Sequence, residues 1–330
     1  MTQVHPTRSL PGTTSARADA QPHFVTRAIG SSSLRVFPLA LSGNVFGWTA
    51  DDAAATSILD TFAEGEGNFI DTADSYAAGR SELMIGRWMR ERRNRDAMVV
   101  ATKVGKSREN PGMHAEAIKR SVTASLSRLG TSHIDLLYLH IDDESVDFDE
   151  TLLAVDELIG EGKVRYFGGS DHTGNRLIQA RIACGQMGVA PMVAIQSHYN
   201  LLHRQEYETG LAHVAAIQGL GMMPRFALAS GFLSGKYRQR ADLASNPRGH
   251  DAAKYLRRKG FKVLNALDEI AEEHDTAVAT IALAWLLNKP GVAAPVVSAS
   301  RATQVPELLA AARVHLTRHQ SAELDRASAY

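Results

Sequence analysis

Eight short apolar runs recur along the 330-residue chain and limit the folds that it can adopt. Successive runs begin 28 to 36 residues apart, except for a step of 72 residues before the last run. Each run is apolar at both odd and even positions, as expected of a strand that is buried on both faces. The runs begin at Phe37, Asn68, Met98, Ile134, Arg165, Val193, Met222 and Ala294.

Helical patterns fill several of the intervals between these runs. Two of them cover residues 114–130 and 149–162 and end at glycines. Their predicted buried positions are Ala115, Ile118, Val122, Leu126, Leu129, Leu152, Val155 and Ile159. Eight strands alternating with helices at about 30 residues per unit predict an α/β fold of the (β/α)8 TIM-barrel type. A doubly wound sheet is the alternative, although the first turn, "SGNVFGWT", lacks the glycine spacing typical of that fold.

Residues 23–330 are predicted to form a single domain, preceded by a disordered extension over residues 1–22. The extension is rich in Ser, Thr, Pro and Arg and has no apolar segment typical of a secretory signal. Two short alternating stretches around Gly30 predict a β-hairpin that plugs the N-terminal end of the barrel. The 72-residue step predicts a long loop after strand 7, residues 231–260, whose many charges suit either a lid over phosphate groups or a solvated loop.

Composition excludes some classes of partner. The 36 Lys and Arg residues balance the 36 Asp and Glu residues, so no basic excess favours nucleic acid or an anionic membrane surface. No apolar run is long enough to span a membrane. Cys184 is the only cysteine, which fits a reducing, cytoplasmic location, and we interpret it as a packed thiol. The oligomeric state stays open.

Polar side chains close five of the apolar runs in succession. They are Asp71, Lys103, His140, Ser170 and Gln196. In a barrel of this type the C-terminal ends of the strands meet at one face, where active sites lie. A ring of polar residues facing water is the structural alternative. We favour a site, because an acid, an ammonium and an imidazole are brought together.

Tyr76, five residues after Asp71, completes a chemically coherent set. A free phenol has a pKa of about 10, and a neighbouring ammonium such as that of Lys103 favours its ionised form. Asp71 can pair with Lys103, and His140 can donate a hydrogen bond or relay a proton. This set suits protonation of an alkoxide formed during carbonyl reduction. No side chain supplies hydride, so a nicotinamide cofactor is implied.

From about Arg27 to the C-terminus the sequence resembles the aldo-keto reductase family. The motifs that carry the resemblance are "DTADSYAAGRSELMIG", "ATKVG", "SLSRLGTSHIDLLYLHIDD", "EGKVRYFGGSD", "QSHYNLLHR" and "ASGFLSGKY". The resemblance implies that Asp71, Tyr76, Lys103 and His140 are the catalytic tetrad, with Tyr76 as general acid.

The resemblance also implies positions for the cofactor. Ser170, Asp171 and Gln196 match residues that hold the nicotinamide carboxamide, and the loop after strand 7 matches one that wraps the pyrophosphate. The other matched positions are Leu228, Ser230, Gly231, Lys236, Ser300, Gln304 and Glu307, and Ser298 in the same stretch is a further candidate contact. Arg301, beside Ser300 at a helix start, can receive a 2′-phosphate, which favours NADP(H) over NAD. As a loop charge, Arg301 would have no such role.

Four positions depart from the family pattern. Asp171 replaces an Asn, and an ionised Asp cannot donate to the carboxamide oxygen. Ser298 replaces a Gly, and Leu308 replaces an Asn that commonly touches adenine. Arg225 stands where an aromatic residue stacks on the nicotinamide, so either Arg225 stacks there and favours the reduced cofactor, or the neighbouring Phe226 does the stacking.

The sequence does not select a substrate within the family's range of sugars, aldehydes, ketones and natural-product carbonyls. Trp48 is a candidate wall of the substrate pocket, or else a core or rim residue. Two other functions stay open. A metal-dependent hydrolase would need converging ligands, and the 13 histidines include no H-x-H pair, so we predict no metal site. The second open function is that of an NADP-binding redox-sensing or regulatory subunit with little turnover.

Overall fold

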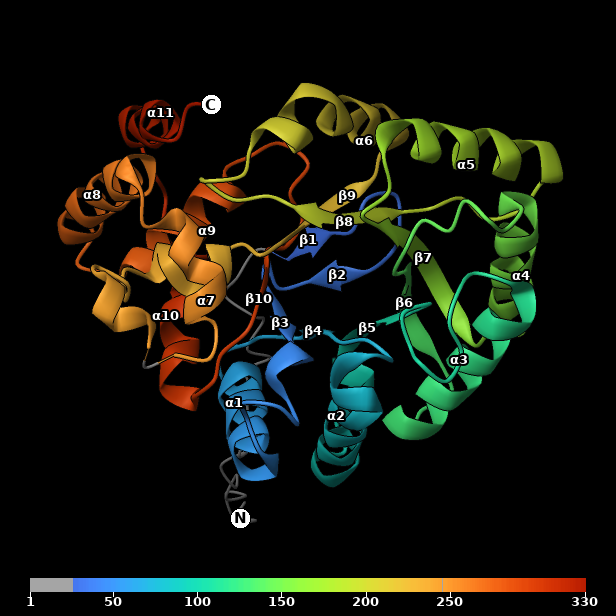
Figure 1. The fold of residues 1–330 in the computed structure, drawn as a ribbon. Coiled ribbons are helices and arrows are strands. Elements are labelled where there is room, and N and C mark those ends of the chain that lie inside the picture. The colour runs from blue at the N-terminus through green and yellow to red at the C-terminus, as the bar shows by residue number, and fades with distance from the viewer. Residues whose placement is uncertain (1–25, 245) are drawn as a thin grey trace, which may run out of the picture.

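Eight parallel strands form one sheet in which strands that follow each other in the chain lie side by side (Figure 1). This computed structural model describes residues 26–244 and 246–330, so the extension predicted over residues 1–22 lies outside its described part. The strands are β3 (Ala40–Ser42), β4 (Phe69–Asp71), β5 (Val99–Val104), β6 (Ile134–Leu139), β7 (Val164–Ser170), β8 (Ala194–His198), β9 (Gly221–Arg225) and β10 (Val296–Val297).

The sheet closes into a barrel because the chain just before β10 pairs with β9. The amide of Met222 donates to the carbonyl of Gly291, and the amide of Ala293 donates to the carbonyl of Met222, both at 2.9 Å. On its other side β10 pairs with β3 in parallel. The predicted (β/α)8 barrel is confirmed. The doubly wound alternative is wrong, because the strand order never reverses.

Helices surround the barrel, and most of them pack on the outer face of its strands (Figure 1). They are α1 (Asp52–Glu64), α2 (Arg80–Arg92), α3 (Ala115–Leu129), α4 (Phe148–Gly160), α5 (Gly174–Met187), α6 (Ala212–Gln218), α7 (Gly249–Ala252), α8 (Arg258–Glu273), α9 (Val278–Leu287), α10 (Val305–Ala310) and α11 (Arg318–Ala327). Within the described ranges, none of these helices combines the length and apolar character needed to cross a membrane.

The two helices predicted from their apolar spacing are α3 and α4. Gly130 follows α3 in the left-handed conformation (φ 62°), which glycine adopts without strain. The buried face of α4 is rotated slightly from the prediction, because Leu158 is buried whereas Ile159 is only partly so. A stripe through Thr151, Val155 and Leu158 follows the spacing of three to four residues per turn.

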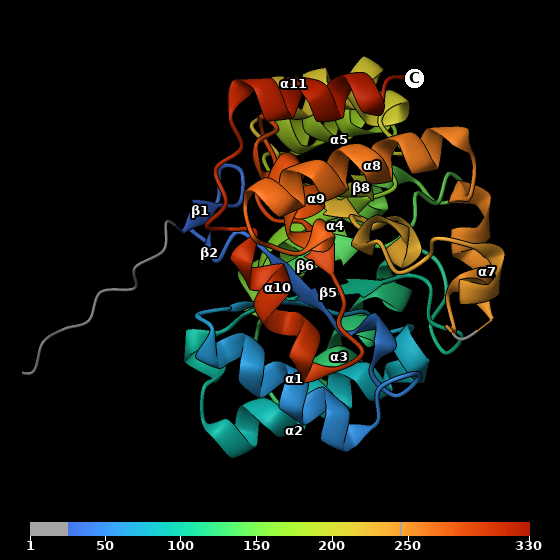
Figure 2. The same ribbon diagram turned by 90° about the vertical axis from the view of Figure 1, so that its left-hand side faces the viewer.

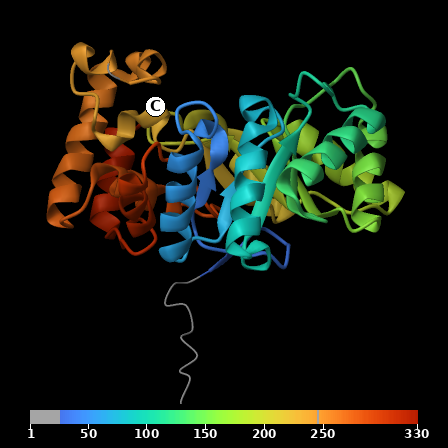
Figure 3. The same ribbon diagram turned by 90° about the horizontal axis from the view of Figure 1, so that it is seen from below.

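An N-terminal hairpin closes one end of the barrel, as predicted. Strands β1 (Arg27–Ala28) and β2 (Arg35–Val36) pair antiparallel. Ile29, Leu34 and Val36 are buried in a cluster with the side chains that fill the barrel interior. In Figures 2 and 3 the hairpin and the segment around α7 lie at opposite ends of the barrel. The interior is therefore reached from the end where the strands have their C-termini.

The turn of this hairpin docks against backbone, and this gives a prediction about stability. Gly30 has φ 51°, and a Cβ there would overlap the carbonyl oxygen of Val193. Gly130 has a similar φ but no atom within 4 Å of such a Cβ. We expect Gly130→Ala to cost about 1–2 kcal/mol from backbone strain alone. Gly30→Ala should cost at least about 2 kcal/mol more, because the hairpin must shift.

Urea unfolding of the two variants beside the wild type measures this difference. Equal losses of unfolding free energy in the two variants would show that the hairpin turn tolerates the extra methyl group, and that its docking contributes little to stability.

The long segment after β9, the seventh strand of the barrel, is mostly built from short helical turns rather than open loop. Helical turns cover Ala229–Ser234, Arg240–Leu243 and Ala253–Tyr255, and α7 lies among them. The predicted boundary at residue 260 is too late, since α8 begins at Arg258. Arg238 ties the segment to α8 through two hydrogen bonds of 2.6 Å to the Asp268 carboxylate.

Cys184 lies buried on the inner side of α5. Burial raises the pKa of its thiol to about 11, so the nucleophilic thiolate is scarce at neutral pH. This agrees with its interpretation as a packed, unreactive side chain.

Candidate active site

A cavity of about 650 Å³ opens at the C-terminal ends of the strands. This volume is typical of a site for a small molecule or cofactor. Tyr76 and His140 line it, and so do all the predicted cofactor positions except one. Those that line it are Ser170, Asp171, Gln196, Arg225, Phe226, Leu228, Ser230, Gly231, Lys236, Ser298, Ser300, Arg301 and Gln304.

A buried ion pair lies behind the cavity wall. Asp71 ends β4, and Lys103 on β5 lies two residues beyond the register partner of Asp71, so both side chains point into the barrel. The Lys103 ammonium donates to both carboxylate oxygens of Asp71 at 2.6 Å and to the carbonyl of Thr72 at 3.0 Å. Gln196 adds a 2.9 Å hydrogen bond to Asp71 Oδ1. These contacts fix the ammonium in place.

The charge of Lys103 is maintained despite complete burial. Burial acts to lower the pKa of Lys103, but the Asp71 carboxylate raises it above its ordinary value. The ammonium is therefore available to a neighbouring oxygen at any physiological pH.

Tyr76 is held next to this ammonium by a constrained turn. Ala77 and Ala78 directly after it have φ values of 49° and 56°, which alanine rarely adopts. Lys103 Nζ lies 5.3 Å from the centre of the phenol ring. Burial raises the pKa of Tyr76, and the opposing effect of Lys103 offsets this only in part. The sequence predicted a net acidified phenol. The structure corrects this, because burial outweighs the ammonium before any substrate oxygen is present.

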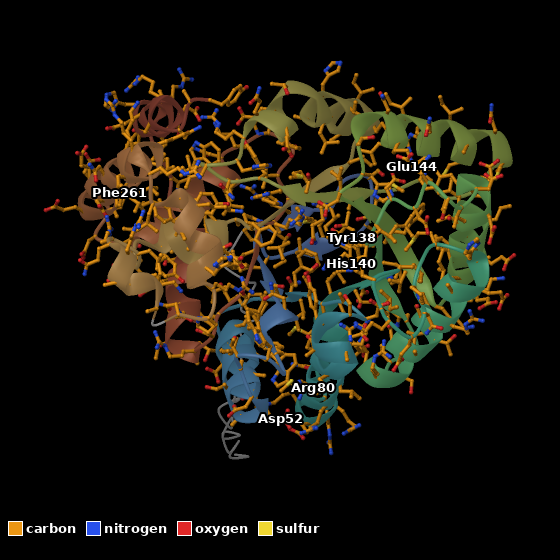
Figure 4. All side chains as sticks on the ribbon, in the orientation of Figure 1. Asp52, Arg80, Tyr138, His140, Glu144 and Phe261 are labelled. Carbon is orange, nitrogen blue, oxygen red and sulfur yellow. The ribbon has the colours of Figure 1, made fainter. Side chains whose placement is uncertain are left out.

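His140 forms the other side of the same corner of the cavity. Its ring lies 6.2 Å from that of Tyr76 in an edge-to-face arrangement of 81°. Burial, with the charges of Lys103, Lys106 and Arg225, lowers the pKa of His140 to about 2. The imidazole is therefore neutral at physiological pH, and a neutral imidazole can donate one hydrogen bond without carrying a positive charge. Figure 4 shows His140 and Tyr138 near the centre of the barrel, whereas Asp52 and Phe261 lie at the periphery.

Tyr138 is a part of the site that the sequence prediction missed. It is fully buried, and its ring centre lies 5.7 Å from Lys103 Nζ. Residues two apart on a strand point to the same side, so the position of Tyr138 two residues before His140 was a usable signal. Tyr138 helps to enclose the ammonium on the side of the barrel interior.

Asp74, between Asp71 and Tyr76, gives a prediction about pH. Burial, reinforced by the charge of Glu82, raises the pKa of Asp74 to about 7. The folded protein thus holds this proton more tightly than the unfolded chain does, and wild-type stability falls as the pH rises from about 4 to 7. Asp74→Asn removes this loss of stability at higher pH, because an amide does not ionise. We expect the variant to be about 2–4 kcal/mol more stable than wild type at pH 8 and nearly equal to it near pH 4.

Urea unfolding of both proteins at several pH values tests this expectation. A stability difference between Asp74→Asn and wild type that does not change between pH 4 and pH 8 would contradict it, since such a constant difference would mean that Asp74 has the same pKa in the folded and unfolded protein.

Two departures from the family pattern contact each other. Arg225 Nε and Nη2 both lie 2.9 Å from Oδ1 of Asp171. Asp171 has φ 60°, which aims its carboxylate across the cavity mouth toward β9. The guanidinium also lies 4.8 Å from the ring centre of Phe226, which lines the cavity as well. The positive charge of Arg225 is therefore paired with the carboxylate of Asp171.

A second group of cations lies on the side of the cavity formed by the segment after β9. Arg248 and Arg301 are close enough to Lys236 that their charges, together with burial, lower its pKa. Gly231 (φ 89°) lies under Lys236, and a Cβ there would come within 2.9 Å of Lys236 Cε. Clustered cations over a bare stretch of backbone fit the phosphate groups of a dinucleotide.

Four predicted site residues do not line the cavity: Asp71 and Lys103, which lie behind its wall, and also Glu307 and Trp48. Glu307 is exposed on α10, where its carbonyl accepts a hydrogen bond from Thr280. Trp48 is 59% exposed, and its ring lies 5.8 Å from the Arg248 guanidinium, at the rim rather than in the wall. Lys106 does line the cavity and was not singled out from the sequence. Its place in the turn directly after β5 was the available signal.

Among residues 26–244 and 246–330, no three His, Cys, Asp or Glu side chains are grouped so as to hold a metal ion. The ligands that a metal-dependent hydrolase needs do not converge in this part of the chain.

A model of the aldo/keto reductase family matches residues 39–329, which include every strand of the barrel. This chain belongs to the aldo-keto reductase family. The four positions that the resemblance gives as the tetrad lie together at one corner of its cavity, with Tyr76 and His140 in the lining and the Lys103–Asp71 pair behind them.

Several known proteins are similar to this aldo-keto reductase over most of its length. A norsolorinic acid reductase of Aspergillus flavus is 31% identical over 91% of this chain and 80% of its own. A probable voltage-gated potassium channel subunit beta of Arabidopsis thaliana is 30% identical over 87% of this chain and 90% of its own. An aryl-alcohol dehydrogenase of Pestalotiopsis microspora is 28% identical over 90% of this chain and 80% of its own.

Proposed function

We propose that this aldo-keto reductase reduces an aldehyde or ketone to an alcohol at the expense of NADPH. The observation that carries the proposal is the corner formed by Tyr76 and His140, backed by the buried Lys103–Asp71 pair. Reductases and dehydrogenases among the relatives support the same reaction class.

In the proposed mechanism the substrate oxygen accepts hydrogen bonds from the Tyr76 hydroxyl and from the His140 imidazole. Bound NADPH supplies the hydride. As negative charge grows on the substrate oxygen, Tyr76 gives up its proton to that oxygen. Lys103 stabilises the resulting phenolate, and Asp71 keeps the ammonium charged and in position. His140 stays neutral throughout, because its pKa lies near 2.

The cationic group of Lys236, Arg248 and Arg301 would hold the cofactor phosphates, with Arg301 and Ser300 at the 2′-phosphate. Hence we propose NADP(H) over NAD. Ser170 and Gln196, which line the same cavity as Tyr76, would face the nicotinamide. The Asp171–Arg225 pair offers both an acceptor and a donor there, and so replaces the amide that a single asparagine would supply.

A regulatory role with little turnover is the second candidate. It is favoured by the similarity to the plant protein named as a probable channel subunit beta. The two candidates differ in one measurable quantity, because only the enzyme turns over substrate at a steady rate.

The experiment is a screen of the full-length protein for NADPH oxidation against a panel of aromatic, aliphatic and sugar carbonyls, repeated with NADH. Sustained turnover of one class with NADPH, and weaker turnover with NADH, supports the proposal. Tight NADPH binding with no turnover of any class would favour the regulatory role. A metal analysis that found a stoichiometric metal would reopen the hydrolase alternative.

A further inference from the structure

We propose that the carbonyl substrate carries a carboxylate and that Lys106 binds it. This inference rests on the proposed reductase function and names the class of substrate that the same cavity takes.

The charged residues of the cavity lining fall into two groups. Its cations are Lys106, Arg225, Lys236, Arg248 and Arg301, and its one acid is Asp171. Lys236 lies within electrostatic reach of Arg248 and Arg301. These three occupy the side of the proposed phosphate site, where a dinucleotide brings several negative charges. The negative charges of the dinucleotide would neutralise these three cations, so their positive charge is not available to a substrate.

The other group surrounds the reacting corner, and nearly all of its charges are paired. Lys103 is neutralised by Asp71, and Arg225 is neutralised by Asp171. Lys106 is left over. Within the described ranges it forms no salt bridge, and the nearest carboxylate that affects its titration, Asp171, is already held by Arg225. One positive charge therefore remains beside the corner where the carbonyl reacts.

The backbone at Lys106 is held in place by a closed turn, although the side chain itself is exposed. Gly105 before it has φ 110°, and a Cβ there would overlap Met113 Cε, so the turn packs closely against that side chain. The amide of Gly112 donates to the carbonyl of Gly105 at 3.0 Å and closes the turn. The charge of Lys106 reaches His140, whose pKa it helps to lower. A substrate bound through its carbonyl oxygen at His140 thus has an unpaired ammonium in its neighbourhood.

A single unpaired lysine matches a singly charged carboxylate better than a dianionic phosphate. Lys106 is itself an exposed side chain, so an ion pair there exceeds the small contribution typical of surface pairs only where the cavity wall and the bound substrate keep water away from it. A hydrogen bond to a charged group contributes about 1.5–3 kcal/mol, equivalent to about 10- to 150-fold in an equilibrium constant. Lys106 should therefore set specificity rather than carry out the chemistry.

The test compares two aldehydes of similar shape, 4-carboxybenzaldehyde and 4-nitrobenzaldehyde, in the full-length protein with NADPH. We expect Lys106→Met to lower the ratio of kcat/KM for the anionic over the neutral aldehyde by about tenfold. The ratio is insensitive to the fraction of folded enzyme. Lys106→Arg should restore much of it, and the matched control Lys163→Met, on the opposite end of the barrel, should leave it unchanged. An unchanged ratio in Lys106→Met would overturn the proposal.

Two further measurements separate this proposal from the proposed function. Added salt should reduce the wild-type ratio but not that of Lys106→Met, because salt screens the ion pair. Calorimetric titration of benzoate and benzamide needs no turnover. Benzoate binding that weakens at least about fivefold in Lys106→Met supports the role of Lys106 even if neither aldehyde is reduced, and equal benzoate binding by both proteins overturns it. Absence of NADPH oxidation with both aldehydes counts against the reductase function alone.

Discussion

Tyr76→Phe is expected to lower kcat for carbonyl reduction by at least about 10²-fold, the usual scale for loss of a general acid. The phenyl ring keeps the packing of Tyr76 against His140, but it has no proton to give to the developing alkoxide. The loss should therefore appear in kcat, with a smaller change in the dissociation constant of NADPH. Initial rates of NADPH oxidation, combined with fluorescence titration of the cofactor, measure both quantities.

The pH dependence adds a second check on this assignment. Because the pKa of Tyr76 is raised and that of His140 lies near 2, neither group should titrate between about pH 5 and 9. The reduction rate with saturating NADPH should therefore show no inflection due to either group over that range. Wild-type turnover in Tyr76→Phe would remove the phenol from its role, and a clear inflection near the ordinary histidine pKa of about 6.5 that disappears in His140→Gln would show that the imidazole titrates after all.

Lys103→Met is expected to lose both activity and stability. Without the ammonium, the Asp71 carboxylate stays buried and uncompensated, which typically costs about 3–5 kcal/mol. Activity should fall at least as far as in Tyr76→Phe, since a phenolate no longer has a neighbouring cation. Urea unfolding and steady-state rates on the same preparation measure the two effects.

The double variant Asp71→Asn/Lys103→Met separates the two losses. The amide introduced by Asp71→Asn is neutral and keeps an acceptor oxygen for Gln196, so most of the lost unfolding free energy should return. Activity should not return, because the cation is still absent. Recovery of both quantities, or of neither, would show that the ion pair does not act as described.

Much of the fold could be predicted from the sequence because most residues of the barrel strands are buried on both faces of the sheet. The resulting apolar runs at regular intervals gave the barrel, and Gly30 between two alternating stretches gave the hairpin. The boundary of α8 and the buried face of α4 were less accurate. Arg258–Gly260 are polar or small and resemble loop residues, and the difference between Leu158 and Ile159 is a single helical step.

The reacting corner of the candidate site was predictable where a residue lies at the end of its own strand, and the cofactor positions were predictable from the family motifs. Asp71 ends β4, Lys103 lies one residue before the end of β5 and His140 one residue after β6, and the barrel topology brings them together. Tyr138 and Lys106 were not predicted, because their place in the site depends on residues of other strands that lie near them. The pKa of a side chain depends on its burial as well as on each neighbouring charge, and burial cannot be judged from one sequence position. The prediction from sequence therefore had the correct sign for the effect of Lys103 on the Tyr76 pKa but the wrong direction for the net shift. The contact between Asp171 and Arg225 lies beyond sequence spacing altogether, because the two positions are 54 apart in the chain.

That contact has a consequence for how relatives of this protein can diverge. A chain that exchanged only Asp171 for an amide would leave a guanidinium without a counterion at the nicotinamide, and one that exchanged only Arg225 would leave a lone carboxylate there. Either intermediate should bind cofactor less well than both end points. The two residues are therefore expected to have changed together during evolution. A change of both at once would lead from the common arrangement to this one without passing through a weakly binding intermediate.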